Sequence, residues 1–143
     1  ETITSTEIDP RRIELEITES VIMKDALKWS SLLNDVKKLG VKIAIDDFGT
    51  GYSSLSYLRR LPIDKLKIDM SFVRDLPVHE DACMIANSII TLSDNMKMTT
   101  LAEGIESVEQ ETYLSANNCE EGQGYLYAKP MSLDDLRVWL KGR

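Results

Sequence analysis

Apolar and polar residues follow two different spacings along this chain. Residues 12–18 alternate apolar with polar side chains, which predicts a strand. Within residues 25–39 apolar side chains fall at i, i+3, i+4 and i+7, and Gly40 follows as a helix-ending glycine. This second pattern predicts an amphipathic helix whose apolar stripe faces a core.

The two patterns recur in turn through the rest of the chain. Strands are predicted at residues 12–18, 41–45, 64–69 and 98–106, with a short last strand within 119–130. Helices are predicted at residues 25–39, 53–61, 81–95 and 108–117, and a final helix is capped by Ser132 with Asp135. This alternation is typical of an α/β fold with a parallel sheet covered by helices. A doubly wound sheet and a (β/α)₈ barrel both fit the order.

Polar residues at the carboxyl ends of the strands distinguish the two folds. They are Glu16, Glu19, Asp46, Asp47, Lys67, Asp69, Glu103, Glu106 and Gln123. Barrel active sites are assembled from residues at the ends of many strands, whereas an open sheet gathers them at one switch point. The pattern favours a barrel, and the absence of an internal repeat or linker indicates one domain.

Residues 43–51 read IAIDDFGTG and carry the most unusual of these strand ends. A buried strand runs directly into Asp46 and Asp47, and Gly49 and Gly51 then predict a loop that bends sharply or approaches another segment closely. Adjacent carboxylates repel each other unless cations, protons or donors compensate them. A lone carboxylate at a strand end is ordinarily solvated or caps a helix, but their recurrence favours a shared polar site that holds a metal ion.

The amino-acid composition excludes several kinds of functional site. The 143 residues include 17 Lys and Arg and 24 Asp and Glu, so the net charge of −7 argues against non-specific nucleic-acid binding. Cys83 and Cys119 are expected to be reduced, buried thiols. The single histidine, His79, is expected at the surface, which argues against a Ser-His pair or a histidine-rich zinc site.

The chain carries neither a membrane-spanning segment nor a signal peptide in its sequence pattern. No stretch approaches the roughly 20 apolar residues that a span requires, and residues 1–12 lack the shape of a signal peptide. We expect a cytoplasmic domain whose own residues make no membrane contact. A larger parent protein anchored through other domains is compatible with this pattern.

Five motifs, taken together, resemble the EAL family of cyclic di-GMP phosphodiesterases. They are ELEITES at 14–20, IDDFGTGYSSLSYL at 45–58, LKIDMSFV at 66–73, AEGIES at 102–107 and GQGYLYAKPM at 122–131. They occur in the family's order and at its spacings over essentially the whole chain. The resemblance implies a (β/α)₈ TIM-type barrel, of which about five of eight βα units are present.

The resemblance also implies roles for individual residues. Divalent metal, Mg²⁺ or Mn²⁺, would bind at Glu16, Asp46, Asp47 and Glu103. Catalytic roles, including orientation of the attacking water by Lys67, would fall to Lys67, Glu103 and Glu106. Contacts to cyclic di-GMP would come from Gln123, Asp69, Lys129 and Pro130. Glu19 would anchor the loop DFGTGYSS.

Two features of the family are absent from the sequence. The Glu-Ala-Leu segment, whose Glu is a metal ligand, and an Asn ligand on a later strand do not occur. We therefore expect residues 1–143 to be the C-terminal portion of an EAL domain, inactive alone as a phosphodiesterase. The alternative is a degenerate receptor that binds cyclic di-GMP without cleaving it.

An incomplete barrel carries a structural consequence. It is expected to expose two sheet edges and an apolar interior, which favours association with other chains. We therefore expect a homo-oligomer that buries the open side.

Overall fold

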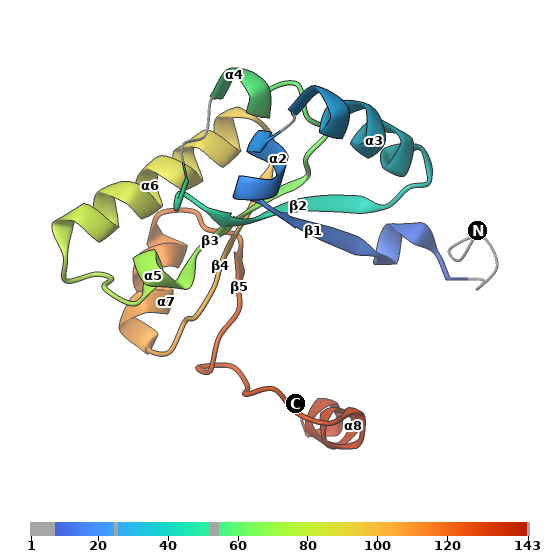
Figure 1. The fold of residues 1–143 in the computed structure, drawn as a ribbon. Helices are drawn as coiled ribbons and strands as arrows, with labels where there is room; N and C mark the ends of the chain where they lie inside the picture. The colour runs from blue at the N-terminus through green and yellow to red at the C-terminus, as the bar shows by residue number, and fades with distance from the viewer. Residues whose placement is uncertain (1–7, 25, 52–54, 143) are drawn as a thin grey trace.

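Five parallel strands form one sheet in this computed structural model, which describes residues 8–24, 26–51 and 55–142 (Figure 1). The strands are β1 (Glu14–Thr18), β2 (Lys42–Phe48), β3 (Lys65–Ile68), β4 (Thr99–Ala102) and β5 (Glu121–Gly122). Their order in the sheet is their order in the chain. A doubly wound sheet reverses its strand order at a switch point, so this order confirms the barrel-type arrangement.

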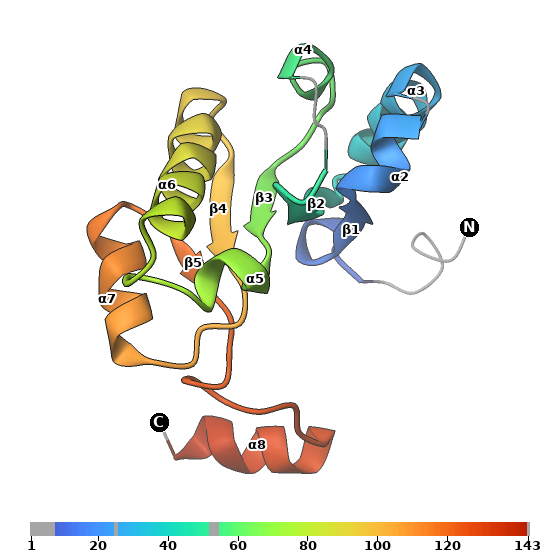
Figure 2. The same ribbon diagram turned by 60° about the vertical axis from the view of Figure 1, so that its left-hand side comes forward.

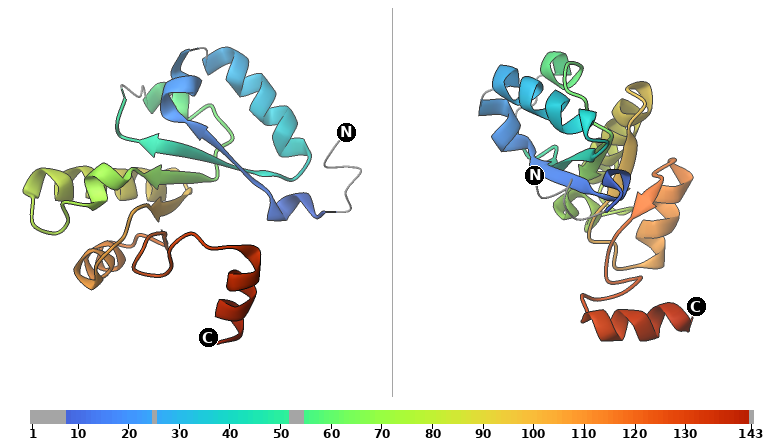
Figure 3. Two further views of the ribbon diagram at one scale, coloured as in Figure 1. Left: turned by 60° about the horizontal axis from the view of Figure 1, so that its bottom comes forward. Right: turned by 90° about the vertical axis from the view of Figure 1, so that its right-hand side faces the viewer.

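Helices alternate with the strands: the 3₁₀ turn η1 (Pro10–Arg12), α2 (Glu19–Lys24), α3 (Ala26–Lys38), α4 (Leu55–Leu58), α5 (Met70–Val73), α6 (Glu80–Asn95), α7 (Val108–Ala116) and α8 (Leu133–Lys141). Those between the first and the last strand cover the outer face of the sheet (Figures 1 and 3). The longest of them, α6, packs against β3 and β4. The predicted α/β class with about five βα units is confirmed.

The core lies between the sheet and these helices. Ile43 and Ile45 on β2 and Leu66 and Ile68 on β3 are fully buried there, and Ala86 of α6 packs in the same cluster. Side chains alternate between the two faces of a strand, so these residues share the helix-covered face. Burying each large apolar side chain contributes about 1.5–3 kcal/mol before the entropy of ordering is subtracted.

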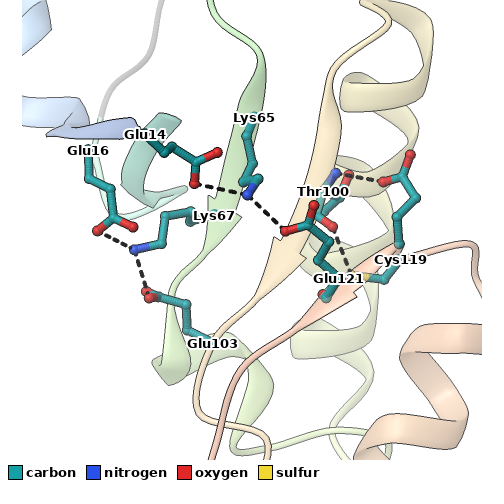
Figure 4. Close-up of polar contacts among 9 residues, drawn as sticks. Glu14, Glu16, Lys65, Lys67, Thr100, Glu103, Cys119 and Glu121 are labelled. Atoms are coloured by element: carbon teal, nitrogen blue, oxygen red, sulfur yellow. Dashed lines mark hydrogen bonds and ion pairs between the residues drawn. The ribbon is translucent and has the colours of Figure 1, made fainter. Parts of the chain in front are cut away.

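The inner face of the sheet is charged, and the expectation of an apolar interior is wrong. Glu14 and Glu16 on β1 and Lys65 and Lys67 on β3 project from this face, where they form ion pairs (Figure 4). The segments ELEIT and KLKI alternate charged with apolar residues, which is the signal for a polar inner face. Ion-paired side chains can remain exposed to solvent. This face therefore does not need to be buried, whereas an apolar face would.

Several element boundaries differ from the prediction. Strand β2 continues to Phe48 instead of ending at residue 45, and β4 ends at Ala102 instead of 106. A short helix, α2, precedes α3 where a single helix from residue 25 was expected; Asp25 itself lies outside the described residues. Helix α4 is confined to Leu55–Leu58, and residues 53 and 54 of the predicted 53–61 helix also lie outside them.

The final helix stands apart from the rest of the molecule. Ser132 caps α8 as predicted, because its hydroxyl accepts a hydrogen bond from the Asp135 amide. No residue of α8 is buried, and apolar Leu133, Val138 and Leu140 are exposed. Figure 2 shows the helix below the sheet, joined by the extended segment after β5.

None of the described helices is long and apolar enough to cross a bilayer.

Candidate metal centre

Asp46 and Asp47 lie inside β2, at an irregularity of that strand. The β2–β3 register shifts between Ile45 and Phe48, and Asp47 adopts a left-handed conformation with φ of 54°. In a regular strand, two adjacent side chains would point to opposite faces. A bulge with one left-handed residue redirects a side chain, and Asp tolerates this conformation better than most residues. The irregularity therefore allows both carboxylates to reach one site.

Glu103 completes a group of three carboxylates. One oxygen from each of Asp46, Asp47 and Glu103 lies within 4.8 Å of the other two, and all three side chains are half-buried. Glu103 directly follows β4, and its amide donates to the Ile68 carbonyl at 3.1 Å. The next residue, Gly104, has φ of 71°, and a Cβ there would lie 2.7 Å from Met70 Cβ. Glycine is required at this close approach, which fixes where Glu103 leaves the strand.

Lys67 lies among the carboxylates, projecting from β3. Its Nζ atom is 2.8 Å from Glu16 Oε2, 2.9 Å from Asp46 Oδ1 and 2.9 Å from Glu103 Oε1. The Lys67 side chain is only 4% exposed. Figure 4 shows Glu16 and Glu103 converging on this ammonium from β1 and from the end of β4. The structure thus brings four of the predicted site residues into contact, from three strands and from the residue that follows a fourth.

Burial and neighbouring charges shift the pKa values of three groups in the site. Burial favours the neutral form of Lys67, but its contacts with Glu16, Asp46 and Glu103 outweigh burial, so the Lys67 pKa lies above its ordinary value. Burial raises the pKa of Glu103, and Lys67 partly offsets this effect. The pKa of Asp47 is also raised, by burial first and then by repulsion from Asp46 and Asp69. The site therefore carries more negative charge than one ammonium compensates.

A buried oxygen tests whether a cation fits here. Asp46 Oδ1 is buried, and the Lys67 ammonium lies 2.9 Å from it as its ion-pair partner. A buried carboxylate oxygen without a hydrogen bond is costly unless a cation satisfies it. Mg²⁺ and Mn²⁺ prefer carboxylate oxygens, so the donor set fits a hard divalent metal.

Glu19 is placed where a loop anchor would be. Its side chain is 1% exposed, and its Oε2 accepts a hydrogen bond from the Gly49 amide at 2.9 Å. A Cβ at Gly51 would lie 2.9 Å from Glu19 Oε1, and Gly49 has φ of 99° against Phe72 and Ile89. Both glycines thus permit the sharp bend and the close approach that the sequence predicts.

Asp69 lies beside the site but serves α5. Its Oδ1 accepts a hydrogen bond from the Ser71 amide at 2.9 Å, which caps the helix. Burial raises the pKa of Asp69, but the hydrogen bonds from Ser71 outweigh burial and lower it overall.

The other predicted site residues are outside the carboxylate group. Glu106 is exposed, and its amide donates to Gln110 Oε1. Gln123, just after β5, lines a cavity of about 500 Å³ together with Leu101 and Tyr127. Lys129 lies with its Nζ 5.5 Å from the Tyr125 ring centroid, and Pro130 is exposed. Contacts of these residues to a dinucleotide remain predictions.

The structure adds a second charged cluster that the sequence analysis missed. Lys65 Nζ lies 2.9 Å from Glu14 Oε1 and 2.8 Å from Glu121 Oε2, so it links β1, β3 and β5 across the inner face (Figure 4). Lys65 by itself does not indicate a functional site. It lies two residues before Lys67, however, so both side chains project from the same face of β3. That alternation is the signal that could have found it.

Both cysteines are free thiols, and they are half-buried where buried thiols were expected. The Cys119 thiol donates to the Thr100 and Glu121 carbonyls at 3.6 and 3.4 Å. His79 is exposed as predicted, and it precedes α6 without a side-chain capping bond.

Comparison with known proteins identifies relatives of this arrangement. The family model for the EAL domain matches residues 1–130. Cyclic di-GMP phosphodiesterase NbdA of Pseudomonas aeruginosa is 44% identical over 129 residues, which are 90% of this chain and 16% of NbdA. The chain therefore spans less than a quarter of that relative.

Solved structures agree. The PaMucR phosphodiesterase in complex with c-di-GMP is 40% identical, with a TM-score of 0.87 over 90% of this chain and 52% of its own. Klebsiella pneumoniae BlrP1, in a complex with manganese and cyclic di-GMP, is 32% identical, with a TM-score of 0.79 over 86% of this chain and 31% of its own. With the family match over residues 1–130, these likenesses show that the chain belongs to the EAL domain family of cyclic di-GMP phosphodiesterases.

Proposed function

We propose that this chain is the C-terminal portion of a metal-dependent phosphodiesterase that hydrolyses cyclic di-GMP to the linear dinucleotide. The observation that carries the proposal is the approach of Asp46, Asp47 and Glu103 oxygens to within 4.8 Å of one another. Phosphodiester hydrolysis develops negative charge and needs an activated water, and an acidic site without a metal would oppose both. The substrate class comes from relatives such as NbdA, a cyclic di-GMP phosphodiesterase.

The metal ligands proposed in this chain are Glu16, Asp46, Asp47 and Glu103. Mg²⁺ or Mn²⁺, when bound, would polarise the phosphodiester and lower the pKa of a bound water. Glu16 contacts the group through Lys67, while the other three carboxylates approach one another directly.

Lys67 and the surrounding polar residues would act on water and substrate. The Lys67 ammonium is a hydrogen-bond donor at the centre of the carboxylates, where it would orient the attacking water. Glu106 would support metal, water or substrate. The proposed contacts to the dinucleotide are Gln123, Asp69, Lys129 and Pro130.

We propose further that the chain alone does not turn over its substrate. It lacks the Glu-Ala-Leu segment, and it covers 52% of the PaMucR chain. Ligands contributed by other strands would then be missing, which weakens metal binding because each lost carboxylate removes a charge from the site.

The decisive experiment incubates the purified chain with cyclic di-GMP and Mn²⁺ or Mg²⁺. Chromatography follows the linear dinucleotide, and calorimetry on the same sample follows binding. The expected result is metal binding without cleavage. Metal-dependent cleavage would contradict the inactivity of the chain while supporting the assigned site.

The roles are tested in a complete domain that carries this sequence. Asp47→Asn should abolish metal-dependent hydrolysis while the fold persists, because an amide is a weaker metal ligand than a carboxylate. Unchanged turnover would remove Asp47 from the site.

Lys67→Ala should lower turnover far more than dinucleotide affinity, whereas a loss confined to affinity would make Lys67 a ligand contact. If the unaltered complete domain binds the dinucleotide without cleaving it, the receptor alternative is favoured.

We also propose that the isolated chain forms homo-oligomers. β1 and β5 are the edge strands of the sheet, and edge strands present unpaired backbone groups to other chains. Exposed apolar residues of α8 add a second contact surface.

A further inference from the structure

We propose that the Lys67 ammonium is a built-in counter-ion that holds the metal-binding carboxylates together when no metal is bound, and that a divalent metal displaces it. This inference rests on the proposed metal site and concerns how that site is loaded. The water-orienting role proposed for Lys67 would follow only after this displacement.

The contacts of Lys67 carry the inference. Its Nζ atom lies within 2.8–2.9 Å of Glu16, Asp46 and Glu103, so the ammonium touches three of the four proposed metal ligands. Its side chain is 4% exposed, which leaves the charge little access to solvent. The carboxylates are thus gathered around a positive charge that belongs to the chain itself.

Two cations cannot use the same oxygens equally. A divalent ion coordinates carboxylate oxygens at about 2.0–2.6 Å, well inside the 2.8–2.9 Å at which Lys67 contacts its partners. Like charges in a poorly solvated site repel strongly. Lysine carries its charge on a flexible four-carbon stem, so moving the ammonium away costs little covalent strain.

Lys67→Met tests the inference because it keeps an unbranched side chain of nearly the same length and removes the charge. Without metal, the variant should unfold at a lower temperature than the unaltered chain, since the carboxylates then repel. Saturating Mn²⁺ should raise the Tm of Lys67→Met more than that of the unaltered chain. Calorimetry should show about tenfold tighter Mn²⁺ binding by the variant.

Lys65→Met is the matched control. Lys65 is also a buried lysine of β3 held by two carboxylates, but its partners Glu14 and Glu121 are outside the Asp46, Asp47 and Glu103 group. Its loss should lower the Tm as well, yet Mn²⁺ should stabilise this variant no more than the unaltered chain.

The results distinguish a failure of the displacement proposal from a failure of the metal site itself. If Mn²⁺ stabilises the unaltered chain as much as Lys67→Met, the metal site stands and displacement is wrong. Stabilisation of neither protein by Mn²⁺ would remove the metal site, and the inference with it.

A measurement on the unaltered chain covers the case in which Lys67→Met does not fold. Nitrogen-15 NMR of the lysine side chains should show a slowly exchanging Lys67 ammonium without metal, because its hydrogens are held by carboxylates. Saturating Mg²⁺ should abolish this signal and leave that of Lys65. A Lys67 signal unchanged at saturating Mg²⁺, with binding verified by calorimetry, would overturn the proposal.

Discussion

At the scale of single residues, the site depends on a backbone conformation that brings neighbouring carboxylates together. Asp47 has φ of 54° at the point where the β2–β3 register shifts. A residue other than glycine that adopts this left-handed conformation costs about 1–3 kcal/mol of folding free energy. It keeps the conformation only where the surrounding structure imposes it. The burial of Phe48 in the core, directly after Asp47, provides that enforcement.

Substitutions at Asp47 should separate charge from backbone strain. Asp47→Asn keeps a side chain that tolerates the left-handed region and removes a charge that is disfavoured on folding. The Asp47 pKa is raised, so its ionised form destabilises the folded chain progressively as pH rises through that pKa. We expect Asp47→Asn to be at least as stable as the unaltered chain at neutral pH without metal.

Asp47→Val provides the contrast. A β-branched residue should cost about 1–3 kcal/mol of unfolding free energy in urea titrations, because it fits this conformation poorly. Equal stability of the Val and Asn variants would show that the strand relaxes at this position.

Cys119 should resist thiol reagents in the folded chain. Burial raises the pKa of its thiol to about 11, so only about 1% is thiolate at pH 9. Labelling with a disulfide reagent at this pH should be slow for Cys119 in the native chain and fast after unfolding in denaturant. Peptide mapping identifies the labelled thiol, and equal rates in the two states would contradict the burial of this group.

At the scale of elements, helix caps reveal which helices belong to the folded body. Ser107 accepts a hydrogen bond from the Gln110 amide, and Gln110 Oε1 accepts from the Ser107 amide, forming a capping box. Gln110 also donates to the Arg74 carbonyl, which joins the start of α7 to the segment after α5. Helix α8 has an equivalent serine cap at Ser132 but buries no residue.

Removing these two caps should therefore have unequal effects. Ser107→Ala should lower the free energy of unfolding by about 1 kcal/mol, because α7 buries Leu114 and Gln110 in the fold. Ser132→Ala should only reduce the helicity of α8 and leave the urea midpoint of the body unchanged. The measurement compares circular dichroism with tryptophan fluorescence in a Trp139→Phe background, where Trp29 of α3 reports the body. An equal shift of the midpoint by both variants would show that α8 docks on the body.

At the scale of the whole molecule, the sheet formed by the described residues combines a charged inner face with two edge strands. Lys65 and Lys67 pair with carboxylates of that face, so the face is ionic and its burial is not needed for stability. The edge strands β1 and β5 and the apolar side of α8 are the surfaces that favour association.

Association should therefore depend on edges and apolar contacts more than on the charged face. Light scattering at micromolar concentration should give a mass above the 16.2 kDa of one chain. Added salt should not dissociate the oligomer, because ion pairs between chains are not its basis. A monodisperse monomer, or an oligomer that dissociates in salt, would contradict this account.

The sequence by itself determined the alternation of strands and helices, the parallel order and the residue types of the site. These follow from local periodicity and from motifs such as ELEITES and LKIDMSFV. From Gly49 and Gly51 it predicted a loop that approaches another segment closely, and the structure places these glycines against Glu19, which the family resemblance alone had singled out.

Only the tertiary structure decided how these residues meet. The register shift that turns Asp46 and Asp47 toward one site depends on pairing with β3, which local periodicity does not encode. The positions of Lys65 and Lys67 among carboxylates of other strands likewise arise from contacts 51 residues apart in the chain. The charged inner face was missed because it too depends on long-range packing. Alternation shows that a strand has two faces, but packing decides which of them the helices cover.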